Sequence, residues 1–572
     1  MKAYLPRNII LTALLFISII TLNSQILPSD RIYNWEKNAG VSGGIPHRTK
    51  IGSTVDAATY GNGKVDASAA IKAAIKACPK GQVVFIPAGT YRLDNPVQGP
   101  DAGNITIRGA GMGKTILKAG TKIRQLMALG DGDPKRPVTG IPVTGGATAG
   151  SKVLTVENTS TINVGNLIRI EQNDLPYVIS TWTPDKDNKR LSVTFKVTAK
   201  TGTTVTVTPA LPFTFTLSPQ IVQYVNAPLI NTGAEDMTLD CNGLCGVGIE
   251  IVQSWGCWVK NVEIMNSTNR QMLFICFVSG EIRHNYAHST TSGGPDHEGI
   301  DFYEDCCFNL IEDNISYDGG FPGIILGDYK GGCAGNVIAY NFVYNTNTGY
   351  ANTAGMDISV SHGPQNIMNL VEGNIASGYG SDGYHGSSSH NTALRNWFTA
   401  THPYCTGNLI AVNIGRWNPY FSLIGNILGT SAFSSNGLYM PEKGFGYSDQ
   451  VIYKLGYPNM GNNSFKGSWG PSDPPSYVGQ SETGGKLQEF DLNVRNTIII
   501  HGNFDYKNKT IIWDPSLSDR KIPSSYFRRT RPEYFGKLTW PPFDPASPPG
   551  EFNDANLSRI PAGYRFVHGV DP

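Results

Sequence analysis

A short pattern of apolar and polar positions recurs between residues 258 and 503. An apolar residue is followed by two variable positions, an asparagine and then further apolar residues. The pattern ends at Asn261, Asn285, Asn314, Asn341, Asn374, Asn396, Asn426 and Asn503. The first seven asparagines are spaced 24, 29, 27, 33, 22 and 30 residues apart, which indicates one structural unit with loops of variable length. Such spacing predicts a solenoid of stacked coils.

The repeated asparagines have a structural explanation. At the same turn of successive coils, their side chains can hydrogen-bond along the stack and satisfy backbone groups there. We therefore predict that they are scaffold, and we look for chemistry elsewhere.

Two segments near the N-terminus predict how the solenoid begins. Residues 66–78 have the pattern of a helix with Asp66 at its N-cap. Residues 82–93 predict a strand, a turn and a second strand. Together, Asp-x-x-x-Ala-Ile-x-x-Ala followed by Val-x-Ile-Pro-x-Gly-x-Tyr resembles the opening of the pectate-lyase-like superfamily of right-handed parallel β-helices. This resemblance implies a helix that caps the first coil, and because many activities share the fold, it says little about the reaction.

The predicted fold class is therefore all-β, a right-handed parallel β-helix with an N-terminal capping helix. A Thr/Val-rich alternation near residues 145–215 predicts a small antiparallel β insertion. The expected division is residues 1–25 as signal peptide, 26–144 as N-terminal cap and first coils, 145–215 as the insertion, 216–527 as the main β-helix with a long loop at 441–485, and 528–572 as a C-terminal cap rich in proline and aromatic residues.

Charge and the N-terminus limit the partners. The formal charge is +1 without a run of Lys or Arg, so no nucleic acid or anionic membrane is expected as a partner. Lys2 and Arg7 precede an apolar run over residues 9–22 that is short for a membrane span of about 20 residues. We expect a secreted protein, extracellular or periplasmic, without a membrane span and monomeric.

The strands that precede the asparagine pattern carry the candidate chemistry. Aligning Gly299-Ile300-Asp301 with Gly355-Met356-Asp357 places both aspartates on the solvent face of one column, two coils apart. Their backbones would then be about 9 to 10 Å apart, because stacked strands are about 4.8 Å apart. That distance overlaps the carboxyl separation of inverting glycosidases, about 6.5–9.5 Å, which leaves room for a water molecule.

The same stretch is rich in other groups suited to acid–base work. Seven of the ten histidines lie between His284 and His402. A charged, histidine-rich patch on a scaffold with few charges is a candidate site, because acid–base catalysis needs groups with tunable pKa values. The candidate catalytic residues are Asp301, Asp357, His362, Glu298, Asp328 and His385, and the candidate substrate-binding residues are Arg416, Trp417, His390, Arg395 and Glu304.

Part of this stretch also resembles polygalacturonases. Residues 297–301 resemble the first motif of that family, Gly327-Asp328 half of the second, and Ser361-His362-Gly363 most of the third. By this resemblance Glu298 replaces one catalytic Asp, Asp328 keeps one of a pair, and His362 matches the family's histidine. Tyr329 stands where the second Asp belongs, and Arg416 is the best substitute for the missing Arg-Ile-Lys motif. The motifs of pectate lyases are absent, so the resemblance implies a relative by fold with another substrate or a rearranged site.

Three functions remain open. The leading hypothesis is a secreted glycoside hydrolase that cuts an anionic polysaccharide, uronic or sulfated as in algal galactans and fucans, without a cofactor or metal. Arginines near the site would bind the anionic groups. The alternative is a polysaccharide lyase, which could use Ca²⁺ held by Asp301, Glu304, Asp328 and Asp357. The third is a non-catalytic glycan-binding solenoid.

Overall fold

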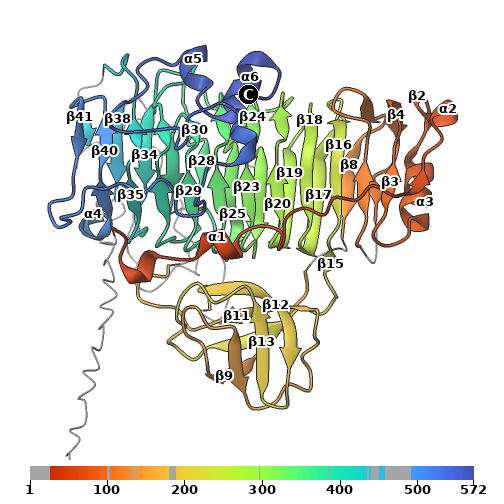
Figure 1. The fold of residues 1–572 in the computed structure, drawn as a ribbon, viewed down its shortest axis with the longest axis horizontal. Coiled ribbons are helices and arrows are strands. Elements are labelled where there is room, and N and C mark those ends of the chain that lie inside the picture. Colours follow the sequence, from red (N-terminus) through yellow and green to blue (C-terminus); the bar gives the residue numbers. More distant parts are fainter. Residues whose placement is uncertain are drawn as a thin grey trace, which may run out of the picture.

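The computed structural model describes residues 26–99, 103–130, 132, 134–137, 139–179, 189–294, 297–383, 385–434, 437–439, 450–457 and 491–572. The predicted signal peptide and most of the predicted loop at 441–485 lie outside these ranges. Residues 450–457 of that loop are described, and the loop prediction is wrong there, because Val451–Leu455 form a strand. The described residues form one long solenoid with a small barrel beside it (Figure 1). The predicted all-β class, a right-handed parallel β-helix, is confirmed.

Most coils contribute one strand to a first sheet and two short strands to a second, and β16 and β18 each run through both positions of the second sheet. Within the described residues the first sheet, called sheet B, has 12 strands. They are β5 (Val97–Gln98), β8 (Ile123–Leu129), β15 (Leu229–Ile230), β17 (Cys245–Trp255), β19 (Arg270–Val278), β22 (Ile300–Glu304), β25 (Ile324–Gly331), β28 (Ile358–Ser359), β31 (Tyr379–Ser381), β34 (Ile410–Ile414), β37 (Gly437–Tyr439) and β38 (Val451–Leu455).

The second sheet, sheet A, folds around the other sides of the solenoid and has 23 strands in the described ranges. They are β1 (Ile51–Thr54), β2 (Asn62–Asp66), β3 (Val83–Phe85), β4 (Gly89–Leu93), β6 (Thr106–Arg108), β7 (Thr115–Ala119), β16 (Gly233–Asp240), β18 (Trp258–Met265), β20 (Glu281–Arg283), β21 (Tyr286–His288), β23 (Leu310–Glu312), β24 (Ile315–Tyr317), β26 (Val337–Ala339), β27 (Phe342–Tyr344), β29 (Leu370–Glu372), β30 (Ile375–Ala376), β32 (Thr392–Leu394), β33 (Trp397–Phe398), β35 (Ser422–Ile424), β36 (Ile427–Leu428), β39 (Ile499–His501), β40 (Asn503–Asp505) and β41 (Thr510–Ile512).

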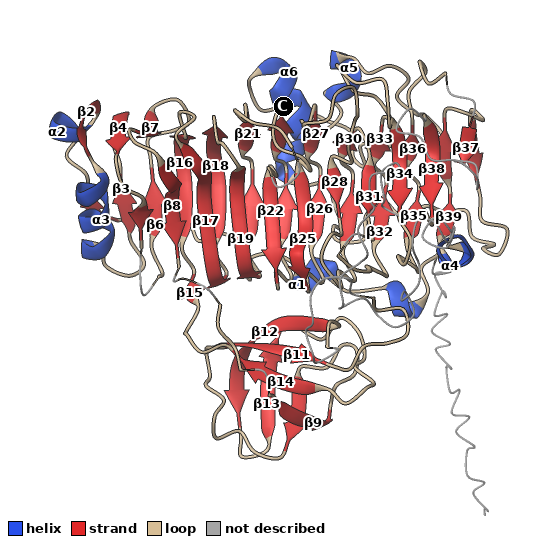
Figure 2. Cartoon of the chain, turned by 180° about the vertical axis from the view of Figure 1, so that it is seen from behind, coloured by secondary structure: helices blue, strands red, loops and turns tan. Residues whose placement is uncertain are grey.

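Helices lie at the ends and along the outside of the solenoid (Figure 2). They are α1 (Trp35–Asn38), α2 (Ala57–Tyr60), α3 (Ser68–Ala77), α4 (Leu492–Thr497), α5 (Asp554–Leu557) and α6 (Pro561–His568). Helix α3 is the predicted capping helix, and Ile71 and Ile75 on its inner face are buried. The predicted N-cap at Asp66 is wrong by one residue: Asp66 ends β2, and the N-cap is Ala67, whose side chain makes no capping hydrogen bond. The Asp66 carboxylate still accepts a hydrogen bond from the Ser68 backbone N–H at 3.0 Å. No helix in the described ranges is long and apolar enough to cross a membrane.

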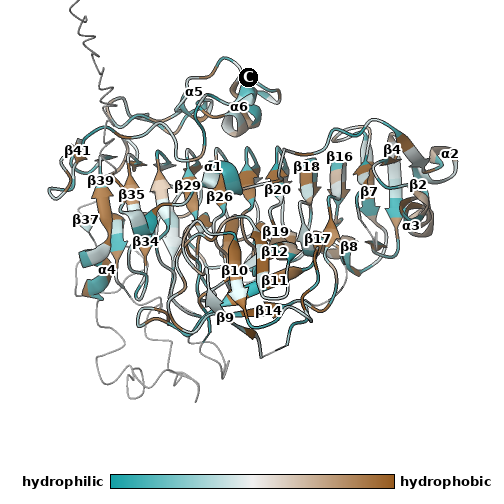
Figure 3. Ribbon diagram, turned by 60° about the horizontal axis from the view of Figure 1, so that its bottom comes forward, coloured by the Kyte–Doolittle hydropathy of each residue, from teal (hydrophilic) through white to brown (hydrophobic). Residues whose placement is uncertain are grey.

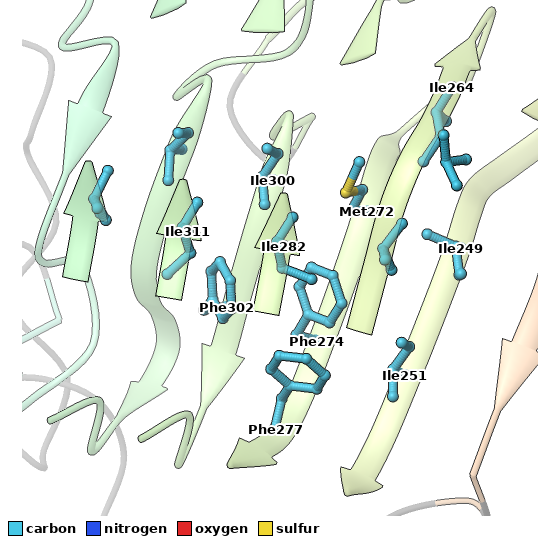
Figure 4. Packing of buried hydrophobic residues seen from close by; sticks show 14 of the residues in the cluster. Ile249, Ile251, Ile264, Met272, Phe274, Phe277, Ile282, Ile300, Phe302 and Ile311 are labelled. Carbon is cyan, nitrogen blue, oxygen red and sulfur yellow. The ribbon is translucent and has the colours of Figure 1, made fainter. Parts of the chain in front are cut away.

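Apolar side chains from all sides of the coils fill the interior. On β22, Ile300 and Phe302 point inward and are fully buried, and Phe302 stacks on Phe274 of the preceding coil at a centroid distance of 4.8 Å (Figure 4). Alternate residues of a strand point to opposite faces. Asp301 and Tyr303 are therefore on the outer face of sheet B.

The asparagines form a continuous ladder at one turn. From Asn285 through Asn314, Asn341, Asn374, Asn396 and Asn426 to Asn503, each side-chain amide donates to the next side-chain oxygen at 2.9 Å. The same oxygens also accept backbone N–H groups. The scaffold role predicted for these residues is confirmed.

The first asparagine of the sequence pattern is not part of this ladder. Val259 pairs with Ile282, so Val262 lies opposite Asn285 and donates its backbone N–H to the Asn285 side-chain oxygen at 3.0 Å. The Asn261 side chain donates to Asp236 instead. A second ladder, absent from the sequence analysis, runs through Asn309, Asn336, Asn369 and Asn391 with amide contacts of 2.9–3.0 Å.

Removing one side chain from the first ladder should weaken the solenoid. Asn341 accepts from the backbone and side chain of Asn314 and donates to Asn374 and the Ile311 carbonyl, all in a buried environment. We expect Asn341→Ala to lower the free energy of unfolding by about 2–3 kcal/mol, because buried polar groups lose their partners. Denaturant unfolding measures this loss. Asn261→Ala is the control and should cost about 1 kcal/mol or less; equal losses would contradict the ladder's role.

The predicted β insertion is a closed antiparallel barrel (Figure 3). Its strands are β9 (Ile141–Gly145), β10 (Val153–Val156), β11 (Leu167–Glu171), β12 (Ser192–Lys200), β13 (Thr204–Thr208) and β14 (Gln220–Gln223). Strands β9 and β14 extend the insertion beyond the predicted 145–215. Asp305, which follows β22, ties the barrel to the solenoid, because it pairs with Arg136 at 3.2 Å and Arg169 at 3.3 Å and accepts the Tyr224 hydroxyl at 2.7 Å.

The C-terminal segment packs along the outside of sheet A. Helices α5 and α6 lie on the opposite side of the solenoid from the barrel (Figure 1). Arg565 of α6 pairs with Asp313 at 2.6 Å, and Arg528 pairs with Glu312 at 2.5 Å. Buried charges on the coils therefore bind this segment to the solenoid.

Candidate active site

Three buried carboxyl groups converge on one arginine on the outer face of sheet B. Arg270, the first residue of β19, contacts Glu298 at 2.8 Å and Asp301 at 2.5 Å through Nε, and Asp328 at 3.0 Å through Nη2. One oxygen from each carboxyl group lies within 4.8 Å of the others. The side chains are 3%, 0% and 6% exposed for the three acids and 14% for Arg270, so water screens these charges little. We call these four residues the carboxyl cluster.

The local backbone explains why the acids meet. Glu298 lies just before β22, and Asp301 points outward from it between two core residues. On the next coil, Phe302 pairs with Leu326 but Glu304 pairs with Gly331, so β25 contains extra residues. This bulge begins at Gly327, whose φ of +77° favours glycine. Asp328 lies in the bulge, and such irregularities often re-aim a side chain beside an active site.

The environment favours the neutral form of some of these acids. Burial raises the pKa of Asp301 well above its usual range, and nearby Asp328 raises it further, while Arg270 and His362 act in the opposite direction. Burial, followed by Asp328 and Asp301, likewise raises the pKa of Glu298. Burial alone would lower the pKa of Arg270, but its three acidic partners raise it, so the guanidinium stays charged. A carboxyl group that holds its proton at neutral pH can act as a general acid.

A histidine–aspartate pair adjoins the carboxyl cluster. His362 follows β28, and its Nδ1 lies 2.8 Å from the Asp382 carboxylate. The Gly363 backbone donates to the Gly327 carbonyl at 2.6 Å, which places His362 beside the bulge that carries Asp328. The His385 ring packs edge-on against His362 at a centroid distance of 4.4 Å. Burial and then His362 lower the pKa of His385 to about 3, so His385 is neutral.

Arg416 and Trp417 lie on the next coil beyond this pair. They follow β34, which pairs with β31, the strand that precedes Asp382. The Arg416 guanidinium lies 4.7 Å from the centre of the Trp417 ring, a cation–π contact. A side chain at Gly383 would meet the Arg416 carbonyl at 2.7 Å, which shows how closely the two turns approach. Both residues therefore border the histidine–aspartate pair.

The predicted column of Asp301 and Asp357 is wrong. Ile300 pairs with Ile324, and Ile324 with Ile358, so Ser359 lies opposite Asp301, while Asp357 is level with Gly299. Neither aspartate is exposed. Asp357 accepts the Thr346 hydroxyl and the Ser377 backbone N–H, both at 2.7 Å, and burial raises its pKa to about 6. The two similar motifs are offset by two residues, and a shift of two preserves the alternation of faces.

Three other predicted residues lie away from the carboxyl cluster. Arg395 donates to the backbone carbonyls of Pro523, Phe543 and Ile522 and so holds the C-terminal segment, which contradicts its assignment to substrate binding. His390 is buried and stacks on Tyr420 at 4.8 Å, and burial lowers its pKa to about 4. Glu304 is buried at the other end of β22, where its charge acts on Arg136 beside the barrel.

The sequence analysis missed Arg270 and Asp382. Arg270 opens the apolar strand 270–278, one coil before Asp301. Extending the strand alignment back by one coil would have placed this cation beside the acids. Asp382 directly follows β31, and only the fold shows that it contacts His362.

Comparison with known proteins agrees with the predicted superfamily. Residues 53–272 match the family model described as rhamnogalacturonase A/epimerase, pectate lyase-like. No curated protein matches the chain. The resemblance to the pectate-lyase-like superfamily is confirmed.

Several solved structures match at low identity. The A-module of the mannuronan C-5 epimerase AlgE4 from Azotobacter vinelandii is 14% identical, with a TM-score of 0.37, over 71% of this chain and 98% of that one. ORF18 of Geobacillus virus E2 is 12% identical, with a TM-score of 0.36, over 65% of this chain and 57% of the viral chain. The GH87 α-1,3-glucanase of Streptomyces thermodiastaticus is 14% identical, with a TM-score of 0.32, over 72% and 69%.

Proposed function

We propose that the protein is a secreted glycoside hydrolase that cleaves an anionic polysaccharide on the outer face of sheet B. One observation carries the proposal: three buried carboxyl groups surround Arg270 and adjoin the pair of His362 and Asp382. Clusters of ionisable groups with shifted pKa values are typical of catalytic sites. The matched family model is named after a rhamnogalacturonase and an epimerase, which agrees with the proposal of an enzyme that acts on glycans.

In this proposal each residue has a separate role in the hydrolysis of the glycosidic bond. Asp301, whose pKa is raised by burial and by Asp328, donates its proton to the glycosidic oxygen as the bond from that oxygen to the sugar carbon breaks. In this proposal the Nδ1–H of His362 donates a hydrogen bond to the Asp382 carboxylate, and Nε2 takes a proton from the attacking water. The water oxygen then forms the new bond to the sugar carbon. Asp328 supplies negative charge near the sugar carbon, where positive charge develops in the transition state.

The carboxyl spacing changes the mechanism expected from the sequence. The acids of the cluster lie too close together for the wide separation in which a water molecule fits between two carboxyl groups. In this proposal the water therefore binds on the His362 side.

A polysaccharide lyase is the second candidate, and His362 favours it as well. The same Nε2 could remove the proton beside a uronate carboxylate. Of the four calcium ligands considered from the sequence, only Asp301 and Asp328 come together, joined by Glu298. Arg270 already contacts all three carboxyl groups and supplies the positive charge, so these residues do not fit a calcium ion.

The reaction products distinguish the candidates. The purified full chain is incubated with a panel of uronic, sulfated and neutral polysaccharides, and the product masses are measured. We expect products that carry one added water and no unsaturated sugar. Products with an unsaturated, ultraviolet-absorbing end would contradict the hydrolase and identify a lyase. Binding without cleavage would leave the third possibility, a glycan-binding solenoid.

A further inference from the structure

A groove beside the carboxyl cluster is lined by cations. It has a volume of about 470 Å³ and lies at the start of β8, β17 and β19 on sheet B. Lys122, Arg124 and Arg270 line it, together with Thr268 and Asn269. No acidic residue lines it in the part of the chain that the structure describes.

The strand register shows how the groove forms. Cys245 pairs with Ile123, and Val247 with both Gln125 and Arg270. Gly246 therefore lies between Arg124 on one side and Asn269 on the other. The absence of a side chain leaves a hollow between these two polar residues, and a Cβ at Gly246 would lie 2.8 Å from the Arg124 carbonyl.

The cations of the groove differ in how far they are neutralised. Arg270 is shared among three buried carboxyl groups. Arg124 pairs with Glu250 at 2.9 Å, but its side chain is 70% exposed, so it can also bind a ligand. Lys122 is exposed and makes no ion pair with any described residue. Exposed positive charge is therefore concentrated at Lys122 and Arg124, away from the carboxyl cluster.

We infer that this groove binds the sulfate or carboxylate group of a glycan residue adjacent to the bond that is cleaved. An anion cannot bind at the carboxyl cluster itself, because up to three negative charges would repel it. Lys122 and Arg124 can bind the anion while Thr268 and Asn269 donate to or accept from sugar hydroxyl groups. One intervening strand, β17, places Arg124 about 10 Å from Arg270 at the usual strand spacing. The placement of this glycan residue next to the cleaved bond rests on the proposed function. The binding of an anion in the groove does not.

Binding to an uncleaved glycan tests the inference. Asp301→Asn slows turnover strongly, and its affinity is measured by calorimetry for oligosaccharides of polygalacturonate, carrageenan and dextran. These probes carry carboxylate, sulfate and no charge, respectively. We expect one of the two anionic probes to bind more tightly than dextran, and its affinity to fall as salt is added. Adding Lys122→Ala and Arg124→Ala should weaken that binding by about tenfold or more.

A matched pair of substitutions controls for net charge. Lys64→Ala with Arg520→Ala, in the same Asp301→Asn background, removes two exposed cations that do not line the groove. This control should leave binding unchanged. Equal affinity for dextran and both anionic probes, or an equal loss in the two double substitutions, would overturn the inference. Anion binding that depends on Lys122 and Arg124 would support it even if the wild-type protein cleaved none of the probes, in which case only the proposed function would fail.

Discussion

Replacing Arg270 with methionine is expected to lower the free energy of unfolding by about 3–5 kcal/mol at neutral pH. Methionine keeps much of the side-chain volume but removes the charge that Glu298, Asp301 and Asp328 share. A buried charge that loses its partner is costly, because neither water nor a counter-ion replaces it. Denaturant unfolding followed by circular dichroism would measure the change.

The loss should depend on pH. Burial raises the pKa of Glu298 and Asp301, so their neutral forms favour the fold below the ordinary carboxyl pKa, and this contribution is lost as the pH rises through the raised values. Without Arg270 these pKa values rise further and the loss with increasing pH grows. We therefore expect Arg270→Met to be close to wild type near pH 4 and much less stable near pH 8.

Arg124→Met is the matched control for that experiment. Arg124 also pairs with a glutamate at 2.9 Å, but its side chain is 70% exposed. An exposed pair contributes only about 0.2–1 kcal/mol. If the two substitutions cost the same, or if the cost of Arg270→Met did not change with pH, the carboxyl cluster would not depend on Arg270 for its charge balance.

The fold was predictable from the sequence because it repeats. The asparagine at a fixed position in each coil satisfies the same backbone groups every time, so asparagine recurs once per coil along the sequence. Asn285 through Asn503 show this directly. The second ladder repeats five residues before the first, at Asn309, Asn336, Asn369 and Asn391. Apolar residues follow the first three of these asparagines, so the sequence contained this period as well. Asn261 fits the pattern but not the ladder, because the register between coils depends on pairing and not on a motif.

The candidate site was predictable only in part, for a related reason. Glu298, Asp301, Asp328 and His362 lie on three neighbouring coils, and the motifs that carry them are each close to a predicted strand. Two features could not be seen: the bulge that aims Asp328 at Arg270, and the offset that separates Asp357 from Asp301. Both are changes of register. The offset of two leaves the pattern of apolar and polar residues unchanged, whereas the bulge interrupts the alternation, since Gly331 follows Leu326 by five residues and Glu304 follows Phe302 by two.

Replacing Asp301 with asparagine is expected to reduce kcat by about 10²–10⁴-fold on the polysaccharide that the wild type cleaves. Asparagine has almost the same shape but cannot donate an acidic proton to the leaving oxygen. Because Asp301 must be protonated to act, wild-type activity should be present below its raised pKa and lost as the pH rises through it. The residual activity of Asp301→Asn should lack this alkaline loss.

Asp357→Asn makes this experiment decisive, because both aspartates are fully buried and both have raised pKa values. They differ in their partners: Asp301 contacts Arg270, whereas Asp357 only accepts from Thr346 and Ser377. Asp357→Asn should therefore cost about 1 kcal/mol of stability and leave kcat and the pH profile unchanged. If Asp357→Asn lost activity as severely as Asp301→Asn while remaining folded, contact with Arg270 would not distinguish a catalytic carboxyl group from a structural one, and the assignment of acid catalysis to the carboxyl cluster would be wrong. If only Asp301→Asn lost activity, contact with Arg270 would be the property that separates the two aspartates.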